Sequence, residues 1–243
     1  MKNLILRSKI ILVVSILFMT SSIAQNYGRV KGNGNVIHKY RDVGSFEKVA
    51  VSGSFDVFLE KGKEGQIDIK IEENLLPYLV TEVKGDQLNI KWKKGTNIST
   101  RKGVVITVQF KDINAVALSG SGDIVAKDRI NADHFETSVT GSGDIELEVV
   151  SNSLKAAVSG SGDIVLKGST KTFDAAVAGS GDISAFHLKS DKANVKVSGS
   201  GDIELTVKNE LKARVAGSGD IDYKGSPKIQ DIKVSGSGDV SSY

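Results

Sequence analysis

The sequence has no cysteine, and histidine and tryptophan are rare, with three and one in 243 residues. The lack of cysteine excludes disulfides, Cys-ligated zinc sites, thiol catalysis and attachment through a lipidated cysteine. The fold must therefore be held together by side-chain packing and backbone pairing. A chain of this length can bury enough apolar surface for that.

The first 24 residues have the pattern of a secretory signal peptide. An apolar run extends from Ile10 to Met19, and small residues stand at Ser22 and Ala24, where a cleavage site needs them. The run is shorter than the ~20 residues of a membrane span. Basic residues precede it at Lys2, Arg7 and Lys9. We expect cleavage before Gln25 and no membrane span thereafter, hence an exported protein of the periplasm, the cell surface or the extracellular medium.

The rest of the chain carries no excess charge. The whole sequence has 32 Lys and Arg against 29 Asp and Glu. Because three of the basic residues and none of the acidic ones lie in residues 1–24, residues 25–243 hold 29 of each. This balance gives no reason to expect nucleic acid or an anionic membrane as a partner.

A five-residue phrase, Gly-Ser-Gly-Asp followed by Ile or Val, occurs seven times and returns every 18 to 21 residues. A period this steady is typical of a repeat protein whose units stack on one another. The two glycines allow a sharp backbone corner at no steric cost. The phrase begins at Gly120, Gly141, Gly160, Gly179, Gly199, Gly217 and Gly236.

Strand-like alternation flanks each corner. Apolar or small residues take every second position before it, as in Leu154, Ala156 and Val158, and again after it, as in Ile164 and Leu166. This alternation is typical of half-buried strands. One strand therefore enters each corner and another leaves it.

Two all-β architectures fit this pattern. In a right-handed parallel β-helix, or solenoid, each unit of about 19 residues is one rung and equivalent residues stack in columns. In an antiparallel hairpin meander or sandwich, the phrase closes a hairpin and places Val158 opposite Ile164. The constant interval and the return of the same residue class at the same offset favour the parallel β-helix.

The sequence divides into a signal peptide (1–24), a flexible lead-in (25–44) and a single solenoid domain (45–243). Within the domain, residues 45–112 are an irregular N-terminal part and residues 113–243 are the regular array. The irregular part begins with a divergent copy of the phrase, in which Phe55 replaces the second glycine, so we expect a differently built corner there. It should also contain a short helical turn at 74–78, a hairpin turn at 84–86 and an exposed loop at 95–103.

The repeated corners, the divergent copy at Val51–Val57 and the strand at Val104–Phe110 resemble the bacterial family named putative auto-transporter adhesin, head GIN domain. The resemblance covers residues 45–243. It implies a right-handed β-helix-like fold and an exported protein. It provides no catalytic or ligand-binding residues to carry over.

Stacked rungs would place seven aspartates in one column. Carboxylates ~5 Å apart repel each other by about 1 kcal/mol in water, so the column needs compensation. We favour a structural role, in which each carboxylate accepts hydrogen bonds from N–H groups of its own corner, and we expect no cofactor. The alternative is a Ca²⁺-stabilised module like the β-rolls, although their nine-residue Gly-Gly-x-Gly-x-Asp motif differs from this phrase. The candidate ligands are Asp123, Asp144, Asp163, Asp182, Asp202, Asp220 and Asp239.

A carbohydrate-active β-helix enzyme, such as a polysaccharide lyase or hydrolase, is a further alternative. The three histidines, His38, His134 and His187, stand at unrelated offsets from the corners, and no nucleophile with a partner base can be placed. Trp92 alternates with apolar residues, which indicates a core position rather than a sugar platform. We therefore predict no catalytic residues.

The sequence thus favours a non-catalytic structural or adhesin-like binding protein of the bacterial envelope, with an unidentified protein or glycan as partner. A face bearing Lys155, Lys196, Lys212 and Lys233 could contact such a partner, although a solvated wall is the favoured interpretation. No polar cap is visible after the last repeat. Either the charged side chains of the last rung prevent another strand from pairing with it, or its edge is open to end-to-end self-association.

Overall fold

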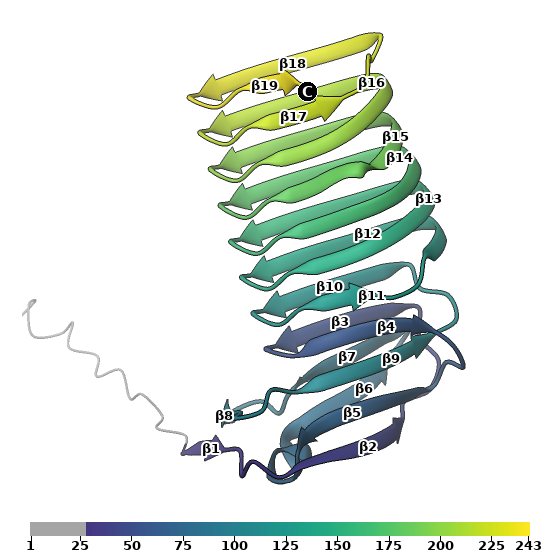
Figure 1. Cartoon of the computed structure of the whole chain (residues 1–243), viewed down its shortest axis with the longest axis vertical. Coiled ribbons are helices and arrows are strands. Elements are labelled where there is room, and N and C mark those ends of the chain that lie inside the picture. Colours follow the sequence, from purple (N-terminus) through teal and green to yellow (C-terminus); the bar gives the residue numbers. More distant parts are fainter. Residues whose placement is uncertain (1–27) are drawn as a thin grey trace, which may run out of the picture.

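The computed structural model describes residues 28–243, and the predicted signal peptide lies outside them. From Ala115 onward the chain forms a coil of stacked strands (Figure 1). Successive turns pair in parallel with equivalent corners opposite each other, as Gly160 is with Gly141 and Gly179. This register confirms the β-solenoid and excludes the hairpin meander. The strands of the array are β10 (Ala115–Gly120), β11 (Ile124–Ala126), β12 (Ile130–Gly141), β13 (Ile145–Gly160), β14 (Ile164–Gly179), β15 (Ile183–Gly199), β16 (Ile203–Gly217), β17 (Ile221–Lys224), β18 (Ile229–Gly236) and β19 (Val240–Ser242).

The coil has two faces, joined by a tight corner on one side and a wide bend on the other (Figure 1). Long strands such as β14 curve at the bend and contribute to both faces. We call face A the strand halves that lead into the corners, which end at β18, and face B the halves that leave them, which end at β19.

The core between the faces consists of columns of like side chains. Valine occupies one inward offset on face A and isoleucine one on face B, and none of these side chains is more than 3% exposed. Each such burial contributes about 1.5–3 kcal/mol, which is how a chain without disulfides stabilises the stack. The two columns are Val139, Val158, Val177, Val197 and Val215, and Ile124, Ile145, Ile164, Ile183, Ile203 and Ile221.

One inward position holds a hydroxyl without a hydrogen-bond partner among the described residues. Thr137 is buried on face A between Val116 and Ala156, and its Oγ1 is unpaired. An unpaired buried hydroxyl costs about 1–3 kcal/mol. We therefore expect Thr137→Val, which puts a methyl group in its place, to raise the free energy of unfolding in urea by about 1 kcal/mol.

Thr170→Val provides the matched control for this change. Thr170 is also buried, but its Oγ1 lies 3.1 Å from Ser151 Oγ and donates to the Thr172 carbonyl at 3.0 Å. The same substitution there should lower stability. Equal effects at the two positions would contradict the argument from the unpaired hydroxyl.

The N-terminal part closes its end of the coil with irregular turns. β7 pairs in parallel with β3, and β9 with β4, whereas β2, β5 and β6 run antiparallel to their neighbours. The predicted hairpin turn joins β6 to β7, and the predicted helical turn is η1. The elements are β1 (Arg29–Lys31), β2 (Val36–Asp42), β3 (Lys48–Gly53), β4 (Asp56–Lys61), β5 (Gln66–Glu72), η1 (Glu73–Tyr78), β6 (Leu79–Lys84), β7 (Gln87–Trp92), β8 (Asn97–Ser99) and β9 (Val105–Phe110).

The segment expected to be a flexible lead-in, 25–44, contains two strands in its described part. β2 pairs with β5 over its whole length, and β1 pairs with β8, which lies within the expected exposed loop 95–103. β2 contains no buried residue. Because it is an edge strand with polar side chains in both directions, its sequence lacks the alternation that marks a half-buried strand.

Phe55 ends the column of second glycines. A Cβ on Gly122, the equivalent residue one turn later, would lie 2.1 Å from the Phe55 carbonyl oxygen, so glycine is required wherever a corner lies beneath. β7, which pairs with β3 on the side away from Gly122, is not followed by such a corner. The Phe55 ring is fully buried there, 5.0 Å from the ring of Trp92. The corner keeps the positive φ of its first glycine, Gly53, as the regular corners do, and the second-glycine positions do not adopt a positive φ. It therefore differs in its buried aromatic ring and not in the backbone strain expected at Phe55, and Trp92 packs against the core.

Glu72 is the only buried charged residue among residues 28–243. Its carboxylate accepts hydrogen bonds from the backbone N–H groups of Gly34, at 2.6 Å, and Arg101, at 2.8 Å, with a further one from Lys102. Burial alone would raise the pKa of Glu72, but these hydrogen bonds and the Arg101 charge lower it overall. The carboxylate thus ties two loops to the end of β5.

Candidate functional site

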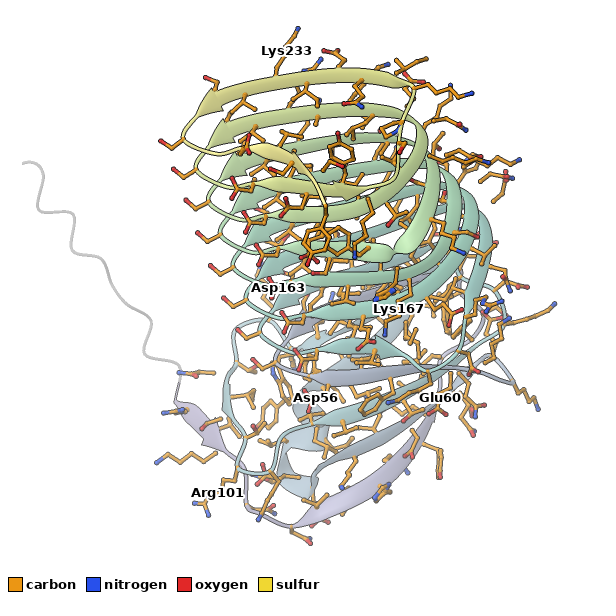
Figure 2. All side chains as sticks on the ribbon, turned by 45° about the horizontal axis from the view of Figure 1, so that its top comes forward. Asp56, Glu60, Arg101, Asp163, Lys167 and Lys233 are labelled. Atoms are coloured by element: carbon orange, nitrogen blue, oxygen red, sulfur yellow. The ribbon has the colours of Figure 1, made fainter. Side chains whose placement is uncertain are left out.

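The seven aspartates form the predicted column along the corner edge of the coil, where Figure 2 labels Asp163. In six successive steps, one carboxylate accepts a hydrogen bond from the backbone N–H of the next aspartate. These N–H to Oδ1 distances run from 3.3 Å at the first step to 2.7 Å at the last. The expectation that each carboxylate would bond within its own corner is therefore corrected, because the donor belongs to the next rung.

This bond completes the pairing of the corner backbone. At the Gly160 corner, the carbonyl of Gly160 already accepts from Ser180 and Gly181, at 2.8 and 3.1 Å. The N–H of Asp182 has no carbonyl opposite it and bonds to Asp163 Oδ1 at 2.8 Å instead. The aspartate column is thus a side-chain continuation of the strand ladder around the corner.

The first and last members of the column differ. Asp123 donates its N–H to the Phe55 carbonyl, at 3.0 Å, rather than to Asp56. Asp239 instead accepts from its own neighbour, Ser241 Oγ, at 2.8 Å. Burial and then the Asp123 charge raise the pKa of Asp56. Near the other end, burial and the charges of Asp220, Asp202 and Asp239 raise the pKa of Asp222.

Substitutions at Asp182 separate the hydrogen bond from the charge. Asp182 lies mid-column and accepts from Asp202 N–H at 2.7 Å. Asp182→Ala should lower the free energy of unfolding by about 1–2 kcal/mol, because that N–H loses its partner. Asp182→Asn keeps an oxygen acceptor and removes two carboxylate repulsions, so we expect it to match or exceed the wild type in thermal unfolding. Equal losses in both variants would show that the negative charge itself is needed.

The column does not form a compact ligand set for a metal ion. Within residues 28–243, no three His, Asp or Glu side chains converge closely enough to hold one. One oxygen of each carboxylate from Asp123 to Asp220 is already occupied by a backbone N–H.

The four lysines expected on one face lie together on the outside of face A. They occupy two neighbouring columns, Lys155 and Lys212 in one, and Lys196 and Lys233 in the other. Lys155 is ion-paired with Glu136 at 3.2 Å, and Lys212 with Glu210 at 3.1 Å. Half of this set is therefore neutralised by neighbouring carboxylates.

A groove at the wide bend holds a second group of lysines, which the sequence analysis did not predict. It has a volume of about 790 Å³ and spans five turns of the coil. Lys171, Lys189 and Lys208 lie on three successive strands at its rim, and none of them forms an ion pair within the described residues. Asp191 is the one acidic residue in the lining. These lysines recur at intervals of 18 and 19 residues, but Lys189 lies opposite Ser169 and not opposite Lys171, so the repeat period alone would not have placed them together.

Hydroxyl groups form the floor of this groove. Ser151, Thr170 and Ser190 stack across successive strands, and Thr206 lies beside them. Ser190 Oγ donates to the Thr206 carbonyl at 2.8 Å, and Thr170 and Ser190 are buried. The exposed surface of the groove is nevertheless more apolar than polar, so the groove combines a largely apolar lining with lysines that form no ion pair in the described chain. The positive charge is suited to an anionic ligand.

The histidines take no part in a shared site in the described chain. The side chains of His38, on β2, and His134, on β12, are 61% and 76% exposed and lie near Asp68 and Asp133. His187 is exposed on β15. No helix among residues 28–243 is long and apolar enough to cross a membrane.

Known proteins resemble this chain in sequence and fold. The family model described as "Putative auto-transporter adhesin, head GIN domain" matches residues 45–227. A putative adhesin from Bacteroides fragilis NCTC 9343 shares the fold at 21% identity and a TM-score of 0.82, over 88% of this chain and 100% of that one. No curated protein matches the sequence.

Two structures from Parabacteroides distasonis ATCC 8503 are closer in sequence. One is described as a putative lipid binding protein, with 28% identity and a TM-score of 0.74, over 88% of this chain and 99% of that one. The other is described as a putative adhesin, with 27% identity and a TM-score of 0.72, over 88% of this chain and 100% of that one.

Proposed function

The chain belongs to the head GIN domain family of putative auto-transporter adhesins, and we propose that it is an exported, non-catalytic binding protein of the bacterial envelope. Membership of an adhesin family supports a binding role. The aspartates of the column support a non-catalytic protein, because their carboxylates bond to backbone N–H groups rather than facing a shared cavity. Their role is therefore structural.

We place the binding surface at the groove of the wide bend. The observation that carries this assignment is the group of three lysines, Lys171, Lys189 and Lys208, which lie on successive strands of the groove and form no ion pair in the described chain. Cations on successive rungs match a ligand with regularly repeated anionic groups. An acidic glycan has that chemistry, and its hydroxyls would bond to the partly exposed Ser151 and Ser169 and to the exposed Ser226 of the lining.

Binding of a polyuronate by the purified protein tests this assignment. We expect the triple variant Lys171→Ala, Lys189→Ala, Lys208→Ala to lose at least tenfold in affinity, and the wild-type affinity to fall with added salt. The matched control replaces Lys93, Lys94 and Lys102, three exposed lysines at the other end of the molecule, and should bind as the wild type does. Equal losses in both variants would point to nonspecific charge attraction.

Further ligands separate the proposed role from its alternatives. A neutral glucan should not bind, and vesicles containing phosphatidylglycerol should bind less tightly than the polyuronate. The reverse order would favour a lipid phosphate as the natural anion, as would suit the lipid-binding relative. Release of new reducing ends from the polyuronate during incubation would contradict a non-catalytic role.

We also propose that the aspartate column works without calcium. Its carboxylates already accept backbone N–H groups, so adding Ca²⁺ after a chelator should leave the Tm unchanged. A rise in Tm with Ca²⁺ that is abolished in Asp182→Asn would instead identify a calcium site in the column.

The compartment is tested in intact cells. If the protein is on the surface, added protease should degrade it while a periplasmic marker survives. If both are degraded only after the outer membrane is opened, the protein is periplasmic, and its partner must be sought there. Retention in the cytoplasm would contradict export.

A further inference from the structure

The last rung of the coil has an open strand edge. Within residues 28–243, β18 pairs only with β16, so its outer row of N–H and C=O groups faces no other strand. Ile232 and Val234 point to the core side but are 38% and 43% exposed. Their equivalents one rung below, Ala213 and Val215, are 0% and 3% exposed. Core-type side chains are therefore uncovered on this rung.

The two ends of the described coil differ. At the N-terminal end, antiparallel strands and η1 cover the stack, and Phe55 with Trp92 fills the end of the glycine column. At the other end, β18 and β19 leave the core open (Figure 1). An open strand edge of this kind is a template for another strand.

We propose that β18 pairs with β18 of a second copy of this chain, in antiparallel orientation about a two-fold axis through Ile232. Residues that lie opposite each other must point to the same face of the sheet, so that inward side chains of one copy meet inward side chains of the other. Because side chains alternate along a strand, this condition holds only if the two-fold axis, perpendicular to the sheet, passes at the level of a residue and not between two residues. With the axis at Ile232, Asp231 lies opposite Lys233 of the other copy, and Lys233 opposite Asp231. On the core side, Ile232 meets its own equivalent, and Val234 meets Gln230.

Charge selects this register among the allowed ones. An axis through Asp231 would oppose two carboxylates, and an axis through Lys233 would oppose two ammonium groups, which is destabilising for directly opposite residues. The axis at Ile232 opposes charges of different sign twice. Asp231 is held in place by Arg214, whereas Lys233 forms no ion pair within residues 28–243 and projects from the last rung (Figure 2). Such an interface is closed, so it yields a dimer rather than a filament.

Sedimentation of the purified protein over a wide concentration range tests the proposal without any added ligand. We expect a monomer–dimer equilibrium. Asp231→Lys and Lys233→Asp should each weaken dimerisation at least tenfold, because each opposes like charges. An equimolar mixture of the two variants should dimerise again. Asp231→Lys carries lysine at both positions 231 and 233, and Lys233→Asp carries aspartate at both, so every lysine of one copy lies opposite an aspartate of the other.

Lys196→Asp is the matched control, because Lys196 lies in the same outward column as Lys233, two rungs below. It should dimerise as the wild type does. Circular dichroism of Asp231→Lys checks that loss of the Arg214 contact leaves the fold intact, and Lys233→Asp avoids that contact altogether. A monomer at all concentrations, single variants that dimerise normally, or assemblies that grow without limit would overturn the proposal.

Discussion

Gly181→Ala is expected to destabilise the protein by about 3 kcal/mol or more, a large effect for the addition of a single methyl group. A Cβ at Gly181 would lie 2.0 Å from the carbonyl oxygen of Gly162, on the rung beneath. Carbonyl and strand are fixed by pairing on both sides, so neither can move by the required ångström without breaking the stack. Urea unfolding monitored by circular dichroism measures the loss.

The adjacent residue provides the control. Ser180 occupies the same corner, between the two glycines, and its side chain is exposed. Ser180→Ala should change the free energy of unfolding by less than about 0.5 kcal/mol. If Gly181→Ala were equally harmless, the rungs would not approach each other at this corner, and the glycine would need another explanation.

Glu72→Ala should cost about 3 kcal/mol, because it leaves the N–H groups of Gly34, Arg101 and Lys102 without their buried acceptor. Glu72→Gln should lower the free energy of unfolding by somewhat less. The amide keeps one oxygen as an acceptor, but its NH₂ group would face a backbone N–H donor that had bonded to the other carboxylate oxygen. Glu73→Gln is the control, because Glu73 is the adjacent, exposed carboxylate and bonds only to the Asn35 side chain in the described structure. It should stay near wild-type stability.

The stability lost in Glu72→Gln should depend on pH. The folded state lowers the pKa of Glu72, so the unfolded chain binds the proton more readily. The stabilisation from the carboxylate is therefore complete above the unfolded pKa of about 4.3 and is lost as pH falls through the lower folded value. The difference in free energy of unfolding between wild type and variant should be largest near pH 7 and shrink in acid. A difference that grows in acid would contradict the assigned hydrogen bonds.

The sequence predicts the regular array well because each corner repeats the same steric demand. The glycines and the alternation also fit hairpins, but the constant interval and the return of the same residue class at the same offset favour parallel stacking, and the structure has that register. The donor to each aspartate could not be predicted in the same way. Every corner carries the same phrase, so the sequence cannot distinguish an N–H of the same rung from one of the next.

The remaining differences arise where contacts join segments far apart in the chain. Glu72 continues an exposed-looking alternation after Ile71, and its burial depends on loops around Gly34 and Arg101 that no local pattern connects to it. β2 lacks a buried residue and reads as a lead-in. The lysines of the bend groove could not be predicted from their spacing, because Lys189 lies opposite Ser169 rather than Lys171 and only the folded bend brings the three into one groove.

The central claim is that successive corners lie directly above one another, and a distance between spin labels at Ser142 and Ser237 tests it most directly. The chain has no native cysteine, so Ser142→Cys and Ser237→Cys can be labelled selectively, and excess unlabelled protein suppresses distances between copies. Five rungs separate these exposed serines, so in-register stacking at ~4.8 Å per rung predicts a Cα separation of about 24 Å. A separation near 48 Å, as expected if each corner were the tip of an antiparallel hairpin ~10 Å from the next, would contradict it.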